Sequence, residues 1–405
     1  MTRAKFSAVS TVGLVLVAAG GVALALANRR PPGGAEPPPD DARAVLKGHG
    51  TWAMALTFSP DGKTLAAPGK EGQVRLWDPA TGREATALEG GVVPLAFSPD
   101  GRTLVTGGAG SRKLTPPGQP ALPPADDALV RLWRVAGGER TATFQVPPCP
   151  PPYPQVVDFV SAASAAFSPD GKTLAVGVSR RDYDHGPVGA VVLWNLATGQ
   201  VAHVRRPTPG VAGDVAPGFS AALPWAFLRS HGSFGFVPAV AYVLGGAALA
   251  STDGRDVSLW DVAGDRERGL LAAGDRPEGA SYACLAASAD GALVAAGEAR
   301  PARFGRDDLP CRAIVWDAAT GRRVAALGGH AGAVLAVAFR PDGKALATAG
   351  ADGVVRLWDL PGGTESAALR GHAGAVLAAA FSPDGKTLAT GGHDGTVRLW
   401  DVPAK

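Results

Sequence analysis

The sequence has little cysteine, methionine or tyrosine, with 3, 2 and 4 of its 405 residues respectively. The cysteines, Cys149, Cys284 and Cys311, are too few for a disulfide framework in a chain of this length, and no two have the spacing of metal ligands. One disulfide between Cys284 and Cys311 stays open in an oxidising compartment, although both also suit small apolar core positions.

An excess of charge is also missing. With 39 Lys+Arg against 36 Asp+Glu, the formal net charge is +3, and charged residues make up 19% of the chain. Residues 1–43 carry about +2 of this excess, so the remainder is close to neutral. The chain therefore has too small an excess of basic residues to form a phosphate-binding stripe, and we expect no nucleic-acid partner.

Turn-forming residues are plentiful by contrast, with 55 glycines and 35 prolines. Because both residue types interrupt long helices and favour tight turns, this composition indicates short strands joined by many turns. A hydrophobic content of 46% suffices for a packed core and excludes a highly charged disordered chain.

The first 43 residues differ from the rest. After a short tail of residues 1–5, residues 6–27 form an uncharged run long enough to cross ~30 Å of hydrocarbon as one helix. This predicts a transmembrane anchor, and the alternative is a signal segment cleaved after Ala27, because Ala25 and Ala27 give a small-x-small pattern. The Pro/Gly-rich residues 28–43 then form a linker.

Basic residues on the two sides of the run favour, by a small margin, a cytoplasmic N-terminus. We therefore expect a single-pass membrane protein whose large C-terminal part lies outside the cytoplasm. Cleavage near Ala27 would instead give a secreted or periplasmic protein.

Tryptophans mark an internal repeat through the rest of the chain. Seven of the nine end a strand-like segment, and the last two intervals between them are both 42 residues. These seven are Trp77, Trp133, Trp194, Trp260, Trp316, Trp358 and Trp400. The earlier intervals are longer, which indicates insertions between the earlier units.

Six of the seven units contain the same kind of turn. The sequence Ser-Pro-Asp-Gly at residues 382–385 joins two apolar segments, and related sequences recur at residues 59–62, 98–101, 168–171, 288–291 and 340–343. Proline presets the second position of such a turn, aspartate caps it and glycine accepts a positive φ. Two antiparallel strands are therefore expected around each copy.

Together with Gly-His before the apolar segment and Trp-Asp after it, these landmarks resemble those of the WD-repeat β-propeller family, here of a bacterial, membrane-anchored type. The resemblance covers residues 44–405. It implies an all-β fold, a seven-bladed β-propeller of four-stranded antiparallel blades. The one N-terminal hydrophobic helix expected at residues 6–27 precedes it. The resemblance also implies that residues 44–46 supply the outer strand of the last blade and close the ring.

Two sets of residues combine a hydroxyl, an imidazole and a carboxylate, the groups used in nucleophilic catalysis. The resemblance implies that each set instead forms a structural tetrad with a tryptophan, in one buried hydrogen-bond network. The two sets are His330, Thr348, Asp352 and Trp358, and His372, Thr390, Asp394 and Trp400. Repetition in neighbouring units favours structure, because catalysis needs one copy. Other histidines lack a second ligand at useful spacing, so we predict no metal site, no cofactor and no catalytic residue.

The long insertions share one face. In a blade with strands a to d, the b-to-c loops and the connections between blades emerge on the same side, and residues 109–128, 179–190 and 298–310 are expected to be extended b-to-c loops. Aromatic and arginine side chains of the insertions are candidate partner-binding residues. They are Tyr153, Arg180, Arg181, Tyr183, Trp225, Phe227, Phe234, Phe236, Arg303 and Arg306.

We therefore expect a non-enzymatic scaffold, a monomeric propeller that binds a protein or peptide partner through this loop-decorated face. Residues 6–27 would tether it to the membrane. The expectation of a scaffold rests on analogy with proteins of the same fold, and a fold does not determine a function. The alternative is an exported propeller enzyme or ligand sensor with a site under the loops of the third to fifth units.

Overall fold

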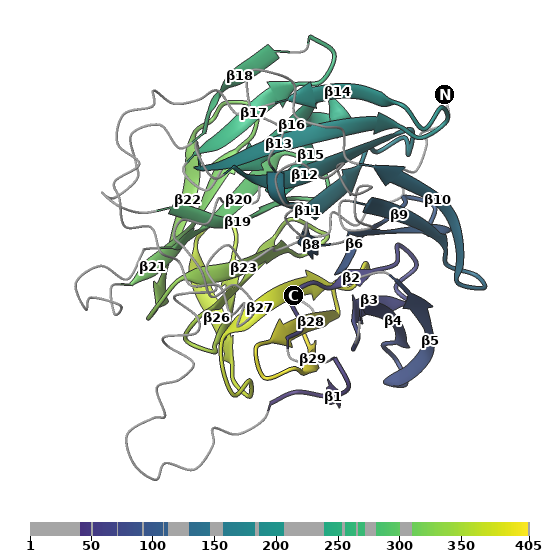
Figure 1. Ribbon diagram of the computed structural model, residues 1–405. Coiled ribbons are helices and arrows are strands. Elements are labelled where there is room, and N and C mark those ends of the chain that lie inside the picture. The colour runs from purple at the N-terminus through teal and green to yellow at the C-terminus, as the bar shows by residue number, and fades with distance from the viewer. Residues whose placement is uncertain are drawn as a thin grey trace, which may run out of the picture.

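The chain forms seven antiparallel sheets arranged as the blades of a propeller (Figure 1). The computed structural model describes residues 41–49, 52–70, 72–90, 93–107, 109–111, 129–145, 157–182, 186–205, 239–252, 256–264, 266–271, 281–299 and 310–403. Six of the sheets have four strands and one has five. The predicted all-β, seven-bladed architecture is confirmed.

The first three blades follow the chain closely, with one exception. Blade 1 contains β2 (Thr57–Phe58), β3 (Leu65–Pro68), β4 (Gln73–Asp78) and β5 (Arg83–Glu89), and blade 2 contains β6 (Val93–Phe97), β7 (Thr103–Gly107), β9 (Leu129–Arg134) and β10 (Glu139–Gln145). Blade 3 contains β11 (Val157–Phe167), β12 (Thr173–Asp182), β13 (Gly186–Asn195) and β14 (Val201–Arg205). The exception is β8 (Ala109–Ser111), which leaves blade 2 and pairs with β11 at the inner edge of blade 3.

The last four blades are regular. Blade 4 contains β15 (Ala239–Val243), the 3-10 turn η2 (Leu244–Gly246), β16 (Ala248–Thr252), β17 (Val257–Asp261) and β18 (Arg266–Leu270), and blade 5 contains β19 (Ser281–Ala287), β20 (Leu293–Ala299), β21 (Cys311–Asp317) and β22 (Arg323–His330). Blade 6 contains β23 (Val334–Phe339), β24 (Ala345–Gly350), β25 (Val355–Asp359) and β26 (Thr364–Leu369). Blade 7 contains β27 (Val376–Phe381), β28 (Thr387–Gly392) and β29 (Val397–Asp401).

The ring is closed by β1 (Ala44–Leu46), as the sequence predicts. This strand pairs antiparallel with β29, with Ala44 opposite Leu399, so the start of the propeller completes its last blade (Figure 1). Arg43 strengthens the junction, since it donates to Asp401 at 2.8 Å and to the carbonyl oxygen of Pro79 in blade 1 at 3.0 Å. Closure removes an open sheet edge that would otherwise pair with other chains.

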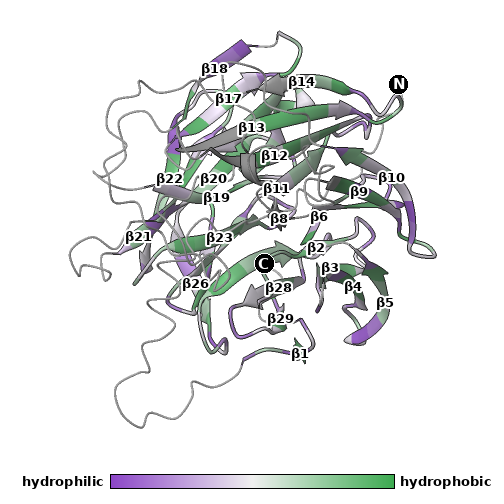
Figure 2. Cartoon of the chain, in the orientation of Figure 1, coloured by the Kyte–Doolittle hydropathy of each residue, from purple (hydrophilic) through white to green (hydrophobic). Residues whose placement is uncertain are grey.

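The core consists of apolar layers between neighbouring blades. Innermost strands such as β23 and β27 are buried along their whole length, and each innermost strand contacts the next around the ring, with β27 against β2. Small residues, mainly alanine, allow seven sheets to converge at the centre, while the large rings of Trp194, Trp316 and Trp400 fill the wider space further out. Outer strands such as β5 and β18 carry the hydrophilic residues (Figure 2).

The a-to-b turns pack against one another on one face of the ring. Their glycines have positive φ, 72° at Gly62 and 71° at Gly101, which favours glycine over any other residue. A Cβ added at these two positions would lie 3.3 Å from Cδ of Pro383 and 3.4 Å from Cδ of Pro60, the prolines of the preceding turns. Because Pro383 belongs to blade 7 and Gly62 to blade 1, the turns also pack against one another at the junction between these two blades.

Some expectations from the sequence need correction. Residues 179–190 were expected as a loop, but all except residues 183–185 belong to β12 and β13, and residues 109–111 of another expected loop form β8. The two described cysteines, Cys284 and Cys311, are buried thiols that form no disulfide with each other. Residues 6–27 lie outside the described residues, and within the described ranges no helix is long and apolar enough to span a membrane.

Candidate functional site

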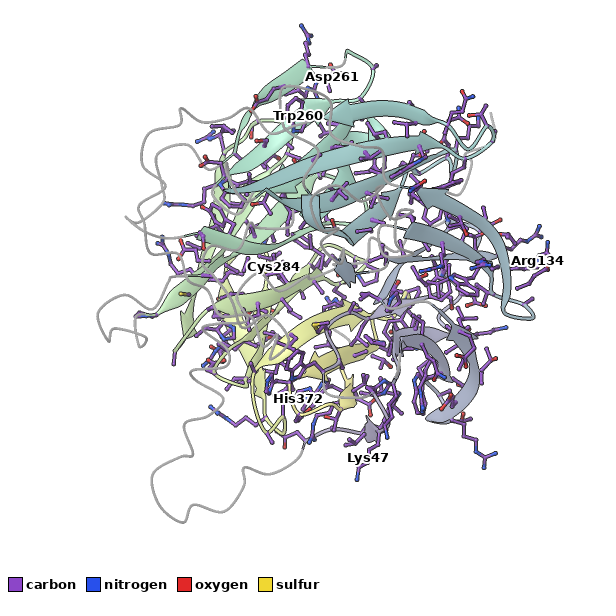
Figure 3. The ribbon with its side chains drawn as sticks, viewed as in Figure 1. Lys47, Arg134, Trp260, Asp261, Cys284 and His372 are labelled. Atoms are coloured by element: carbon purple, nitrogen blue, oxygen red, sulfur yellow. The ribbon has the colours of Figure 1, made fainter. Side chains whose placement is uncertain are left out.

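The structure brings together the four tetrad side chains of blade 7. Thr390 Oγ1 accepts a hydrogen bond from Trp400 Nε1 at 2.7 Å and lies 2.8 Å from His372 Nε2. On the other side of the imidazole, Nδ1 lies 3.1 Å from Asp394 Oδ2. Because the carboxylate can only accept, Nδ1 donates to it, and in the neutral ring with that tautomer Nε2 accepts from the threonine hydroxyl. The network thus joins strands b and c to the loops at one end of the blade; its histidine, His372, is labelled in Figure 3.

Blade 6 repeats this geometry in detail. Thr348 Oγ1 accepts from Trp358 Nε1 at 2.8 Å and lies 2.8 Å from His330 Nε2, while His330 Nδ1 lies 3.1 Å from both oxygens of Asp352. Gly350 makes room for the pair, because a Cβ there would lie 2.5 Å from His330 Nδ1. A glycine at the end of strand b is therefore part of the motif.

Each tetrad aspartate also holds its own loop in place. Asp394 accepts hydrogen bonds from the N–H of Ala373 at 2.9 Å and from the N–H and hydroxyl of Thr396 at 3.0 and 2.7 Å. Burial acts to raise the pKa of Asp394, but the hydrogen bond and electrostatic attraction of His372, followed by the bonds from Thr396 and Ala373, hold that pKa well below its ordinary value. The same balance lowers the pKa of Asp352.

The chemistry open to these networks is limited by access. The side chains of Thr348 and Thr390 are fully buried, and their hydroxyls already bond to both an imidazole and an indole. A substrate cannot approach a hydroxyl in that position. The arrangement therefore serves to tie strands and loops together in each blade.

The aspartate of Trp-Asp caps the c-to-d turn, a role that the motif alone did not reveal. Asp317 Oδ1 accepts hydrogen bonds from the N–H groups of residues 319 and 320 at 3.1 and 2.8 Å, and Asn195 caps the corresponding turn of blade 3. Arg134 replaces the cap in blade 2 and instead pairs with Glu139 at 2.6 Å. Figure 3 shows Arg134 and Asp261 at the periphery of the ring, far from His372.

Comparison with known proteins finds the same repeat. A family model described as "WD domain, G-beta repeat" matches residues 41–78, 321–359 and 363–401. The chain carries WD40 repeats. The small ribosomal subunit protein RACK1z of Oryza sativa subsp. japonica is 41% identical over 51 residues, which make up 13% of this chain and 15% of that relative. The aligned part is therefore a short stretch of both proteins.

The matched WD40 segments are those that contain a Gly-His pair, and two of them hold the complete tetrads. Other blades of the propeller keep only part of the network. In blade 2, Trp133 Nε1 donates to Thr106 Oγ1 at 2.9 Å, and Gly-Gly at residues 90–91 stands where Gly-His would be. In blade 1, His49 and Trp77 are buried, but Ala67 stands in place of the threonine.

Blade 5 contains a different link, which sequence reasoning missed. Glu298 was expected to begin a loop, but it lies in β20 with a fully buried side chain. Its oxygens accept hydrogen bonds from the backbone N–H and the guanidinium of Arg312 in β21, at 3.0 to 3.3 Å. The detectable signal was a glutamate directly after the apolar run of a strand b, where the complete units have glycine.

The loop-decorated face of the propeller is described in part. Arg180 and Arg181 lie in β12, opposite Val188 and Pro187 of β13, in a hairpin that extends beyond the other blades. The remaining candidate partner-binding residues lie outside the described residues. They are Tyr153, Tyr183, Trp225, Phe227, Phe234, Phe236, Arg303 and Arg306. Within the described ranges, no three His, Cys, Asp or Glu side chains are grouped to hold a metal ion.

Proposed function

We propose that this WD-repeat propeller is a non-enzymatic scaffold that binds a protein or peptide through its loop-decorated face. The observation that carries the proposal is the extension of blade 3. Strands β11, β12 and β13 have 11, 10 and 10 residues, whereas β23, β24 and β25 of blade 6 have 6, 6 and 5. The extra pairs lengthen the sheet by roughly 13 Å at about 3.3 Å per residue.

The extension lies at the b-to-c end of the blade, the end at which Asp352 and Asp394 hold short loops in blades 6 and 7. It is paired on its inner side with β8, so a segment from blade 2 supports it. A rigid sheet that projects from a closed ring offers both a surface and an edge to a partner. Rigid elements recognise partners with less loss of entropy than free loops do.

The test is removal of the extension alone. Val178 and Ala190 are directly opposite each other, so a two-residue Asn-Gly turn can replace residues 179–189 and leave the remainder of β12 and β13 paired, while residues 159–161 of β11 keep their pairing with β8. Affinity capture with the full chain in detergent, followed by mass spectrometry, should retain a partner that the trimmed variant loses. A matched control, Lys63→Ala on the opposite face, should keep it. Capture of the same partner by the trimmed variant with unchanged affinity would overturn the proposal.

Membrane tethering through residues 6–27, with the propeller outside the cytoplasm, is part of the same proposal. Its support is the uncharged, helix-length run followed by a Pro/Gly-rich linker. Alkaline extraction of membranes should leave the full chain in the pellet and release a variant without residues 6–27. If alkaline extraction instead releases the protein and its N-terminus lies directly after Ala27, the segment has been cleaved.

A further inference from the structure

Blade 1 has a histidine and a tryptophan in tetrad positions but no hydroxyl between them. His49 is 1% exposed and Trp77 is 7% exposed, and their ring centroids lie 5.2 Å apart. Ala67 occupies in β3 the position that Thr348 occupies in β24, two residues after the leucine that pairs with the tryptophan. Ala67 therefore supplies a methyl group at the register position where the complete tetrads have a threonine side chain.

The surroundings of the two rings determine which ring nitrogens donate and which accept a hydrogen bond. His49 Nδ1 lies 2.8 Å from the carbonyl oxygen of Pro68, which can only accept, so Nδ1 carries a proton. Burial lowers the pKa of His49 despite that hydrogen bond, so the ring is neutral at pH 7 and its Nε2 is an acceptor. Trp77 Nε1 is a donor. Neither Nε2 of His49 nor Nε1 of Trp77 has a hydrogen-bond partner among the described residues.

A single oxygen that donates one hydrogen bond and accepts another satisfies this pair. In blade 6 the hydroxyl of Thr348 does so, at 2.8 Å from His330 Nε2 and 2.8 Å from Trp358 Nε1. A buried donor or acceptor without a partner is costly, and buried waters occupy sites with two or more polar partners. We propose that blade 1 binds one water molecule between His49 Nε2 and Trp77 Nε1, in place of the threonine hydroxyl.

The site lies in the layer that closes the ring. Trp77 and Ala67 belong to the apolar cluster between blades 1 and 7, together with Leu46 of the closing strand and Leu399 of its partner. A water at this position completes the hydrogen bonding of the first blade at that junction. It goes beyond the scaffold proposal and does not depend on it.

Two substitutions at one position test the proposal, because a water and a dry pair of rings predict opposite results. Ala67→Val fills the position without a hydroxyl, so it expels the water and leaves both nitrogens without partners. The folding equilibrium constant of the full chain should then fall about tenfold or more. Ala67→Thr supplies the hydroxyl and should leave that constant unchanged or raise it by up to about 30-fold. An Ala67→Val variant as stable as wild type would overturn the proposal.

Blade 6 provides a matched control. Thr348→Ala recreates the arrangement of blade 1 and should admit a water, so it should cost less than Thr348→Val, which keeps the shape and blocks the water. A direct measurement does not depend on any variant: a crystal structure that resolves buried waters should show density within about 3.2 Å of both nitrogens. Absence of such density, with both rings ordered, would also overturn the proposal.

Discussion

Replacing Asp394 by asparagine should destabilise the propeller although the two side chains have the same shape. Oδ2 accepts from His372 and from the N–H of Ala373, while Oδ1 accepts from the N–H and hydroxyl of Thr396. An asparagine has one oxygen, so one of these two sets of donors meets an amide NH2 instead. Each set contains two donors, so at about 1–3 kcal/mol for each group left without a partner we expect a loss of about 2 kcal/mol or more.

Asp352→Asn in blade 6 is the natural comparison. Asp352 accepts from His330 and from two backbone N–H groups, but Val354 stands where blade 7 has Thr396, so no hydroxyl donates to it. Its substitution should therefore cost about 1 kcal/mol less. Glu139→Gln, in an exposed ion pair with Arg134, should cost less than about 0.5 kcal/mol and serves as the surface control.

The Asp394 effect should depend on pH in a defined direction. The pKa of Asp394 is held below its ordinary value of 3.8, so the unfolded chain binds this proton more readily than the folded chain. The contribution to stability is complete well above pH 4 and is lost as pH falls below it, by up to about 1.4 kcal/mol per pH unit. Between pH 7 and pH 3, the difference between wild type and Asp394→Asn should shrink by about 1 kcal/mol.

Urea denaturation of the full chain, followed by tryptophan fluorescence at both pH values, measures these differences. Two results would refute the reasoning. One is an unchanged midpoint for Asp394→Asn at pH 7, and the other is a difference from wild type that is the same at pH 7 and pH 3.

Three further predictions concern other parts of the ring. Ala289→Pro should raise the free energy of unfolding by about 0.4–1 kcal/mol, because residue 289 holds the turn position that proline fills in other blades. The ring has room, since a Cβ on Gly343 of the following turn would meet nothing within 4 Å. A denaturation midpoint at or below that of wild type contradicts this prediction. Arg43→Ala should cost at most about 1 kcal/mol, since its ion pair with Asp401 is exposed, yet it should speed amide hydrogen exchange in β1, and unchanged exchange would show that closure does not need this side chain. In a Cys149→Ser variant, the thiol of Cys284 should react with a disulfide reagent only on unfolding, because burial raises its pKa to about 12; rapid labelling of native protein at pH 8 would contradict the buried placement.

Local signals in the sequence predicted most of the ring. A Ser-Pro-Asp-Gly turn dictates two antiparallel strands without reference to the rest of the chain, and a tryptophan 42 residues from the last one marks the next blade. The closing strand was also predictable, because the Ala-Val-Leu of β1 matches the outer strands of complete units. These features depend on residues close in sequence or on a repeat that can be aligned with itself.

Features that depend on distant, unrepeated contacts were not predictable. β8 is three residues of an insertion in blade 2, and it becomes a strand only because β11 of the next blade lies beside it. The hairpin of β12 and β13 contains Arg180, Arg181 and Pro187, which suit a loop better than a strand, and the neighbouring strands decide the outcome. Glu298 has one partner, Arg312, and no second copy of this pair in the repeat reveals it.

A complete network needs a short b-to-c loop, although blade 1 shows that a short loop is not sufficient, because only four residues separate β3 from β4 and Ala67 stands in place of the threonine. A tetrad needs the b-to-c loop to return within a few residues, since Asp352 must reach His330 from the loop that follows strand b. Where that loop is replaced by long insertions, as in blades 3 and 5, the carboxylate cannot be held at this position, and extended strand pairing or the Glu298–Arg312 pair links the strands instead. Blades 6 and 7, with intervals of 42 residues, have no insertion and keep both tetrads. The propeller is thus divided between blades whose short loops stabilise the ring and blades whose long loops are free to carry a binding surface.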